Sequence, residues 1–277
     1  MNYSFKNMKL MLEQKRFVFK KKYGQNFIID ENIINAIINK SAIDKETLVI
    51  EIGPGSGALT IKLAETAKNV LCYEIDTSLR EILSDVLKDC KNVEIIYDDF
   101  LKRNVLLDIK KYKYNSLYVV ANLPYYITTP IIVKLIEDNI DVKKIVVMVQ
   151  KEVGNRFRAK PGSRDYNSLS VFLNYFYDVK KIMDVSKNVF MPKPNVDSIV
   201  VEFNKKEKNL SIKNKELFFK LIRDSFRQKR KTIKNNLKGY DLEKVEKILK
   251  KHNLSLSSRA ERISTEIFAE IANYLAI

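Results

Sequence analysis

The sequence predicts an α/β fold in which a largely parallel sheet is followed by a smaller region made only of helices. Between residues 47 and 150, apolar runs typical of buried strands alternate with segments that have the apolar spacing of helices. Strands that are separated by helices assemble into parallel sheets. A glycine-rich loop, residues 53–57, directly follows the first strand, and after the charged stretch 205–209 only helical patterns occur.

The first strand (47–52), the glycine loop and a helix (58–67) form the beginning of a nucleotide-binding fold. Glycines allow the backbone to approach a ligand without a Cβ atom in the way. The second strand (70–76) brings Glu74 to about 20 residues beyond the glycines, where an acid binds ribose hydroxyls. The spacing G-x-G-x-G, in place of G-x-G-x-x-G, favours a ligand without a pyrophosphate. The alternative is a loop with a purely structural role.

The next helix (78–87) leads to a third strand (93–97) that ends at Asp98 and Asp99. Two adjacent acids at the end of a strand suit hydrogen bonding to the amino group of an adenine. They suit the capping of the following turn equally well.

The fourth strand (117–121) ends at the stretch Asn122-Leu123-Pro124-Tyr125. Proline cannot continue a strand, so Asn122 lies just beyond the carboxyl end of the sheet, where open α/β sheets bind ligands. The Asn122 amide can both accept and donate hydrogen bonds, and the Tyr125 ring offers a face for stacking a base. This combination favours a site that holds a flat ring bearing an amino group. A simple turn is the alternative.

A helix (130–137) and a fifth strand (144–150) complete the parallel part of the sheet. Beyond it we expect a helix (167–175) and two strands (179–185 and 196–203), paired antiparallel at the sheet edge. The loop between these strands carries Phe190, which either presents its ring to a ligand or belongs to the core.

The C-terminal region predicts four helices, at 214–228, 231–237, 242–251 and 265–275. A dense basic run crosses the first two of them: Arg223, Arg227, Lys229, Arg230, Lys231, Lys234 and Lys238. A charge run is usually a solvated face, but one this dense favours contact with nucleic-acid phosphates. Residues 1–22 are basic and aromatic as well, and predict either a loosely ordered arm or an RNA-contacting one.

The composition points to the same class of partner. The chain of 277 residues has 50 Lys and Arg against 34 Asp and Glu, a net charge of +16. Nucleic acid is the leading partner and an anionic membrane surface the second. No apolar run approaches the roughly 18–20 residues that span a bilayer. Cys72, Cys90 and His252 cannot build a disulfide framework or a zinc site, so we expect no metal and a reducing cytoplasm.

Several motifs together resemble one family, the ribosomal RNA adenine dimethyltransferases. They are Gly24-Gln25-Asn26-Phe27-Ile28, Glu51-Ile52-Gly53-Pro54-Gly55, Glu74-Ile75-Asp76, Asp98-Asp99 and Asn122-Leu123-Pro124-Tyr125. The small-subunit branch is similar in four further stretches: Thr128-Thr129-Pro130, Pro161-Gly162-Ser163, residues 190–198 and Arg230-Lys231-Thr232. One departure is Asn167, where that branch often has glycine.

The resemblance implies a Rossmann-like class I methyltransferase domain at residues 1–206, with the basic arm 1–22, and a helical RNA-binding domain at 207–277. It implies S-adenosylmethionine as cofactor. The residues that would contact it are Asn26, Ile28, Gly53, Glu74, Asp99 and Asn122. Among these, Glu74 would hold the ribose hydroxyls and Asp99 the adenine amine.

For the substrate, the resemblance implies that Asn122 and the backbone of Leu123 and Pro124 receive the target amine. Tyr125 would stack on the target base and Phe190 would close its other face. The target would be two adjacent adenosines in a hairpin loop near the 3′ end of small-subunit rRNA, each dimethylated during subunit biogenesis. The residues expected to bind this RNA are Arg223, Arg227, Arg230, Lys231 and Lys234.

We expect a monomer that acts on a partly assembled small subunit. Two alternatives stay open from the sequence. One is an adenine methyltransferase of large-subunit rRNA, of the macrolide-resistance type. The other is a non-catalytic nucleic-acid binder with the same fold, against which the set of Glu74, Asp99 and Asn122 argues.

Overall fold

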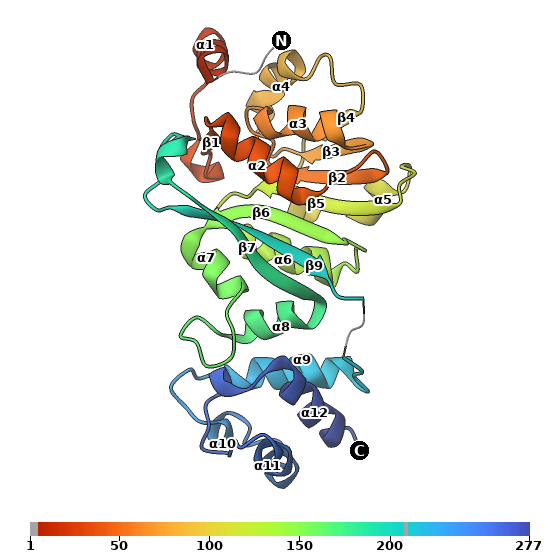
Figure 1. The fold of residues 1–277 in the computed structure, drawn as a ribbon, viewed down its shortest axis with the longest axis vertical. Coiled ribbons are helices and arrows are strands. Elements are labelled where there is room, and N and C mark those ends of the chain that lie inside the picture. Colours follow the sequence, from red (N-terminus) through yellow and green to blue (C-terminus); the bar gives the residue numbers. More distant parts are fainter. Residues whose placement is uncertain (1–4, 208–209) are drawn as a thin grey trace. The chain divides into compact units, whose positions relative to one another are not determined.

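The structure, a computed structural model, describes the backbone of residues 5–207 and 210–277 (Figure 1). The chain forms two compact units. The first runs to Lys151 and includes Lys180–Asn204, and the second consists of Glu152–Val179 and Lys205–Ile277. Within the described residues, no helix combines the length and the apolar character that crossing a bilayer requires.

The centre of the first unit is a seven-stranded sheet, most of whose strands are parallel (Figure 1). Its strands are β2 (Thr47–Ile52), β3 (Asn69–Tyr73), β4 (Val93–Ile96), β5 (Ser116–Asn122), β6 (Lys144–Gln150), β7 (Tyr177–Val185) and β9 (Ser198–Lys205). The strand order is β4-β3-β2-β5-β6-β9-β7. The strands β2 to β6 are parallel, and β9 runs antiparallel to β6. The predicted α/β fold is confirmed, and the two predicted edge strands are neighbours at one side of the sheet, with β7 outermost.

The strand order places a ligand crevice between β2 and β5. From β2 the chain moves outward to β3 and β4, and then crosses back to β5 on the other side of β2. The carboxyl ends of β2 and β5 therefore meet at a topological switch point, where open α/β sheets bind ligands. All six residues of β2 are buried, as expected for a strand covered on both faces.

The helices of the first unit are α1 (Phe5–Gln14), α2 (Glu31–Ser41), α3 (Ala58–Thr66), α4 (Arg80–Val86), α5 (Val105–Ile109) and α6 (Thr128–Glu137). A small second sheet pairs β1 (Phe27–Ile28) antiparallel with β8 (Phe190–Met191). Short 3₁₀ helices occur at Lys21–Tyr23, Thr77–Leu79, Phe100–Lys102 and Lys187–Val189.

The N-terminal arm, residues 1–22, contains a helix, whereas one of its two interpretations from the sequence is a loosely ordered arm. Residues 1–4 lie outside the described part, but Phe5–Gln14 form α1. On α1, Met8 and Leu12 are 1% and 4% exposed and pack with Leu79 and Leu83 of the segment around α4. The apolar spacing i, i+4 therefore anchors this helix on the first unit.

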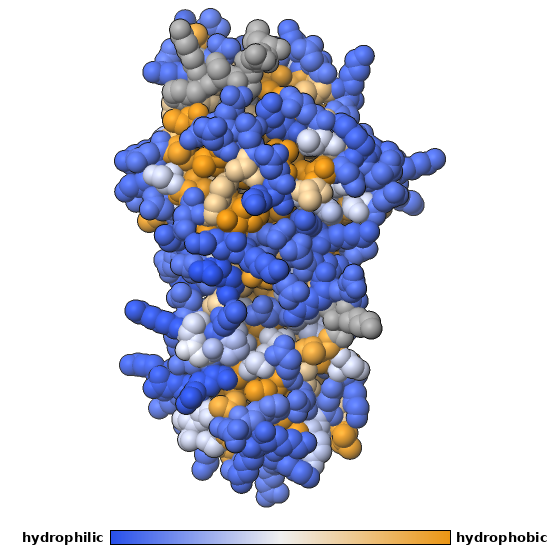
Figure 2. Space-filling view, in the orientation of Figure 1, coloured by the Kyte–Doolittle hydropathy of each residue, from blue (hydrophilic) through white to orange (hydrophobic). Residues whose placement is uncertain are grey.

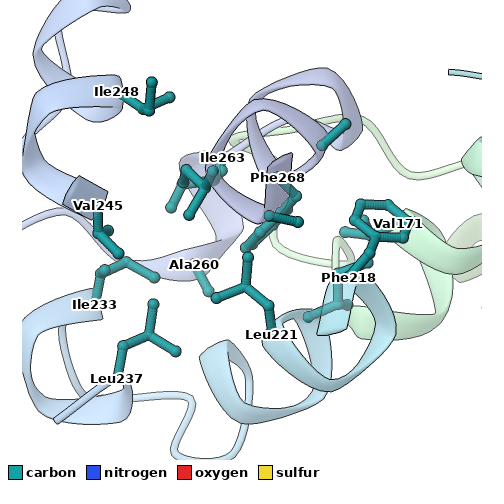
Figure 3. Close-up of a cluster of buried hydrophobic side chains, with 14 of the residues drawn as sticks. Val171, Phe218, Leu221, Ile233, Leu237, Val245, Ile248, Ala260, Ile263 and Phe268 are labelled. Carbon is teal, nitrogen blue, oxygen red and sulfur yellow. The ribbon is translucent and has the colours of Figure 1, made fainter. Parts of the chain in front are cut away.

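The second unit is helical and has its own core. It contains α7, which begins at the boundary (Lys151–Phe157), α8 (Ser168–Phe176), α9 (Lys215–Ser225), α10 (Ile233–Asn236), α11 (Leu242–Lys251), a 3₁₀ helix (Ala260–Arg262) and α12 (Thr265–Leu275). Phe218, Leu221, Val245 and Phe268 are fully buried and point toward one another from α9, α11 and α12 (Figure 3).

The division of the chain differs from the boundary expected at residue 206. One crossing between the units lies near residue 204, close to the charged stretch, but residues 152–179 belong to the helical unit as well. The cause is apolar packing: Val171 and Tyr175 of α8 join the cluster formed by Phe218 and the other helices (Figure 3). Of the three crossings, the sequence marks only the last, near residue 204, by a change of composition.

Candidate active site

A cavity opens in the first unit at the carboxyl ends of β2, β3, β4 and β5. It encloses about 900 Å³, including its open mouth. Its walls are residues 23–28, the glycine loop 53–56, Glu74, the pair Asp98 and Asp99, and residues 122–127. All six residues expected to bind the cofactor line it: Asn26, Ile28, Gly53, Glu74, Asp99 and Asn122.

The glycine loop is shaped by backbone conformations that favour glycine. Gly53 and Gly55 have φ angles of 76° and 57°. A Cβ atom at Gly55 would lie 2.8 Å from Cε1 of Phe27, closer than such atoms approach in proteins. Glycine at this position therefore allows the segment around Phe27 to close against the loop and complete the wall of the cavity.

The Glu74 carboxylate is buried at the end of β3 and is held from two sides. It is 4% exposed, and it accepts hydrogen bonds from the backbone N–H groups of Asp76 (2.8 Å) and Gly55 (3.3 Å). Burial raises the pKa of Glu74 to about 7, although these two bonds oppose the shift. This acid therefore changes its charge near neutral pH, and it lines the cavity. The ribose contact expected of Glu74 stays a prediction.

Asp99 caps the turn that follows it. Its Oδ1 accepts a hydrogen bond from the N–H of Leu101 at 3.0 Å, at the start of the 3₁₀ helix Phe100–Lys102. The capping interpretation of Asp99 is thus correct, and the same residue also lines the cavity. The adenine contact expected of Asp99 stays a prediction.

Asn122 is oriented by a contact from a distant segment. Its Nδ2 donates a hydrogen bond of 2.9 Å to the backbone carbonyl of Asn26. Because this bond uses the amide nitrogen, Oδ1 is the amide atom that Asn122 presents as an acceptor. The Pro124 carbonyl accepts two local bonds, from the N–H of Ile127 (3.2 Å) and from Oγ1 of Thr128 (3.0 Å). The turn after β5 is therefore fixed by its own hydrogen bonds.

The side chain of Tyr125 is held in place by a hydrogen bond at its hydroxyl group. Its hydroxyl lies 2.7 Å from Oγ of Ser198, a buried residue at the start of β9. Burial raises the pKa of Tyr125, so the hydroxyl stays protonated at neutral pH. The ring lines the cavity while its polar end is tied to the sheet.

Phe190 does not line the cavity. It is 3% exposed and packs in the core beside Ile34 and Ile37, and in β8 it is paired with Ile28. The structure therefore supports the core interpretation of this residue. Its expected contact with the base stays a prediction.

Glu51 also lines the cavity, although it is not among the site residues that the sequence predicts. It is 1% exposed within β2, and burial raises its pKa to about 8. The signal is present in the sequence, because Glu51 is the single charged residue of β2 and stands between two isoleucines. A buried acid in a central strand at a ligand crevice is typical of functional sites.

The basic residues expected to bind RNA lie in the second unit and are all exposed: Arg223, Arg227, Arg230, Lys231 and Lys234. Within the part of the chain that the structure describes, none of the five is in an ion pair with a carboxylate. In contrast, the neighbouring Lys220 pairs with Asp224 at 3.1 Å. Figure 2 shows mostly hydrophilic residues on the visible face of this unit, with hydrophobic residues in small patches.

Known proteins share both the sequence and the fold. The family model "Ribosomal RNA adenine dimethylase" matches residues 16–277. Proteins named ribosomal RNA small subunit methyltransferase A are 46% identical over 276 residues in Bacillus pumilus (96% of this chain, 94% of that protein) and 45% identical over 273 residues in Staphylococcus aureus (95% and 92%).

Among solved structures, a dimethyladenosine transferase from Plasmodium falciparum superimposes with a TM-score of 0.74 at 27% identity, covering 88% of this chain and 95% of that one. The 23S rRNA methyltransferase ErmE shares the fold with the same TM-score at 23% identity, covering 91% and 100%. These matches confirm the Rossmann-like class I methyltransferase fold and the resemblance that the sequence motifs carry. The chain belongs to the ribosomal RNA adenine dimethylase family.

Proposed function

We propose that this chain uses S-adenosylmethionine to dimethylate the exocyclic amines of two adjacent adenosines in a hairpin loop near the 3′ end of small-subunit rRNA. The observation that carries the proposal is the oriented amide of Asn122, which faces the same cavity as the buried Glu74. An acceptor for an amine and an acceptor for ribose hydroxyls thus share one crevice. Membership of the family and the small-subunit relatives support the choice of substrate.

The residues of the cavity fit S-adenosylmethionine. Glu74 offers a carboxylate to two ribose hydroxyls, and Asp99 lies at the end of the next strand for the adenine amine. The positive φ angles at Gly53 and Gly55 keep Cβ atoms out of the crevice. When bound, this cofactor supplies the methyl group as an electrophilic carbon attached to a positively charged sulfur.

The chain's own contribution to the transfer is to orient the target amine. An adenine amine is a weak nucleophile because its lone pair is delocalised into the ring. Oδ1 of Asn122 and the carbonyl of Leu123 can accept the two amine hydrogens and so direct the lone pair toward the methyl group. The Pro124 carbonyl is already engaged by Ile127 and Thr128, so Leu123 is the better second acceptor. Such catalysis acts through position and electrostatics, without a covalent enzyme intermediate.

Tyr125 holds the base and the second unit holds the RNA. A stacked base cannot reach the cavity, so the target must be flipped out or unpaired in a loop. Stacking on the braced Tyr125 ring would contribute about 1–3 kcal/mol. The exposed cations at 223–234 would contact phosphates of rRNA in a partly assembled subunit. The enzyme would act as a monomer in the cytoplasm.

The test is transfer of tritiated methyl groups to small and large subunits from cells that lack the modification. We expect label in small subunits alone, located as dimethyladenosine at two adjacent positions. Label in large subunits would favour the macrolide-resistance type of activity. A folded protein that binds rRNA and transfers no label would favour a non-catalytic binder.

A further inference from the structure

The proposed reaction assigns no role to the buried carboxylate of Asp76. It lies just beyond β3 and is 1% exposed. Four donors surround it: Nζ of Lys20 at 2.5 Å, Nε2 of Gln25 at 2.7 Å, and Oγ and the N–H of Ser78 at 2.7 and 3.1 Å. Burial alone would raise the pKa of Asp76, but the bonds from Lys20, Ser78 and Gln25 lower it overall, so the group is ionised at neutral pH.

Two of these donors belong to one segment of the chain, residues 20–26. Gln25 uses both ends of its side chain, since Oε1 accepts from the N–H of Lys20 at 2.7 Å while Nε2 donates to Asp76. Inside the segment, the N–H groups of Tyr23 and Gly24 bond to carbonyls three residues earlier. The segment is therefore a closed turn, and its side chains attach it to Asp76 and Ser78.

The other end of the segment reaches Asn122. The backbone carbonyl of Asn26 accepts the hydrogen bond from Nδ2 of Asn122, and the Asn26 side chain bonds to the carbonyl of Gly24 at 3.0 Å. If the carbonyl of Asn26 moved away, nothing in this contact would prevent the Asn122 amide from turning by 180°. It would then present N–H groups to an amine, and two donors do not bind each other.

We infer that Lys20, Gln25 and Asp76 form a latch that holds segment 20–26 against the cavity and thereby fixes the amide of Asn122 in its accepting orientation. They are positioning residues, since they act on the target amine only through Asn26 and Asn122. The inference rests on the proposed function for its effect on methyl transfer. The latch itself is a property of the folded chain.

Asp76 also links the latch to Glu74, on the side of the cavity where the cofactor is expected. The N–H of Asp76 donates to the Glu74 carboxylate at 2.8 Å, while its side chain holds Lys20 and Gln25. One short turn after β3 therefore fixes the residue expected to bind ribose and the segment that orients Asn122.

The first test compares Lys20→Met with Lys21→Met by hydrogen–deuterium exchange. The two substitutions remove the same charge from adjacent positions. Lys21 is exposed, and its side chain has no hydrogen bond or ion pair among the described residues, so its variant is the matched control. We expect faster exchange of the amides at residues 20–28 in Lys20→Met alone, with Lys20→Arg restoring protection. Equal exchange in the Met variants would overturn the latch, and this readout needs no methyl transfer.

The second test asks whether the latch acts through Asn122. At saturating cofactor and RNA, Lys20→Met should slow single-turnover transfer by roughly tenfold to hundredfold, the scale of a small misplacement in an active site. In an Asn122→Ala background the same substitution should cause no further loss. An equal loss in both backgrounds would mean that Lys20 does not act through Asn122, and the positioning role would fall.

Together, the exchange test and the transfer test distinguish a failure of the latch from a failure of the proposed function. If the parent protein transferred no methyl groups to rRNA while Lys20→Met still loosened residues 20–28, the proposed function would fail and the latch would stand. If transfer proceeded normally and Lys20→Met behaved as Lys21→Met in both arms, the function would stand and the latch would fail. Asp76→Asn provides a second variant of similar size, for which circular dichroism checks the fold.

Discussion

The cavity of the first unit and the basic surface of the second differ in whether their polar side chains have partners within the chain. Around the cavity, Glu74, Asp76 and Asn122 are held by partners from other parts of the chain. On the basic surface, defined by the exposed residues Arg223, Arg227, Arg230, Lys231 and Lys234, the cations have no carboxylate partner among the described residues. One region is fixed before any ligand binds, and the other leaves its charges available.

The proposed function accounts for this difference. Orienting an amine requires an acceptor placed within a fraction of an ångström, and only a side chain that is itself hydrogen-bonded keeps such a position. Binding phosphates requires charge near a backbone that is uniform along the RNA, and long mobile cations serve well for that. Under the proposed function, the first unit positions the amine and the second unit supplies affinity for RNA.

The largest expected effect is that of Asn122→Ala, which removes the oriented acceptor. Methyl transfer should fall by orders of magnitude because the amine is no longer directed toward the methyl group. RNA affinity should stay close to that of the parent, since phosphate contacts dominate it. The measurement is single-turnover transfer at saturating enzyme, with RNA binding measured on the same variant. Transfer at the parental rate would return Asn122 to the role of a simple turn residue.

Glu74 should make cofactor binding depend on pH. Its raised pKa means that the folded protein keeps a proton between pH 4.5 and about 7 that the unfolded chain releases, so this group stabilises the fold at low pH and the contribution is lost as the pH rises through 7. Ribose hydroxyls favour the ionised carboxylate, so affinity should rise with pH, by about tenfold from pH 6 to pH 8.

Calorimetry on Glu74→Gln provides the check. The variant should lose the pH dependence, and at pH 8 it should bind more weakly by about 1.5–3 kcal/mol, the value of a charged hydrogen-bonding group. A parental pH profile in a folded variant would remove Glu74 from the site.

Reversing the charge of Arg230, Lys231 and Lys234 should weaken rRNA binding and leave cofactor binding unchanged. The slope of log affinity against log salt should fall by about 0.7–0.9 for each lost phosphate contact. Reversal of Lys247, Lys250 and Lys251 on α11 alters the net charge equally and serves as the control. Equal slopes in the two triple variants would mean that net charge, and not this surface, determines binding.

The smallest expected effect is that of Tyr125→Phe. It removes the bond to Ser198 but keeps the ring, so we expect a loss of about 0.5–1.5 kcal/mol, expressed in stability and slightly in transfer. Tyr125→Ala removes the ring and should lose roughly 1–3 kcal/mol of stacking in addition. If both variants transferred methyl groups equally fast, the ring would not hold the base.

Local patterns are sufficient to predict much of the fold and several of the residues that line the cavity. The parallel strands, the glycine loop and the positions of Glu74 and Asn122 follow from short apolar runs and from the residues that end them. These positions can be predicted from neighbouring residues alone. For example, Pro124 ends the strand, so Asn122 must lie at the end of that strand, at the edge of the sheet.

What escaped prediction depends on contacts between distant residues. Lys20 and Gln25 are 56 and 51 residues away from Asp76, and no spacing rule connects them. The strand pair β1 and β8 joins two segments of two residues each, too short for a periodic signal. Residues 152–179 join the helical unit because their apolar side chains fit its core, which a linear reading of composition does not reveal.

The engaged carbonyl of Pro124 has a consequence for the number of methyl groups. With Pro124 bonded to Ile127 and Thr128, the proposed arrangement leaves the amine two acceptors, Oδ1 of Asn122 and the carbonyl of Leu123. An unmodified adenosine brings two N–H groups to them, but a monomethylated one brings a single N–H. The two transfers are therefore chemically unequal, and the second relies more heavily on the Tyr125 ring to retain the base. The intermediate that accumulates when stacking is weakened should be monomethyladenosine.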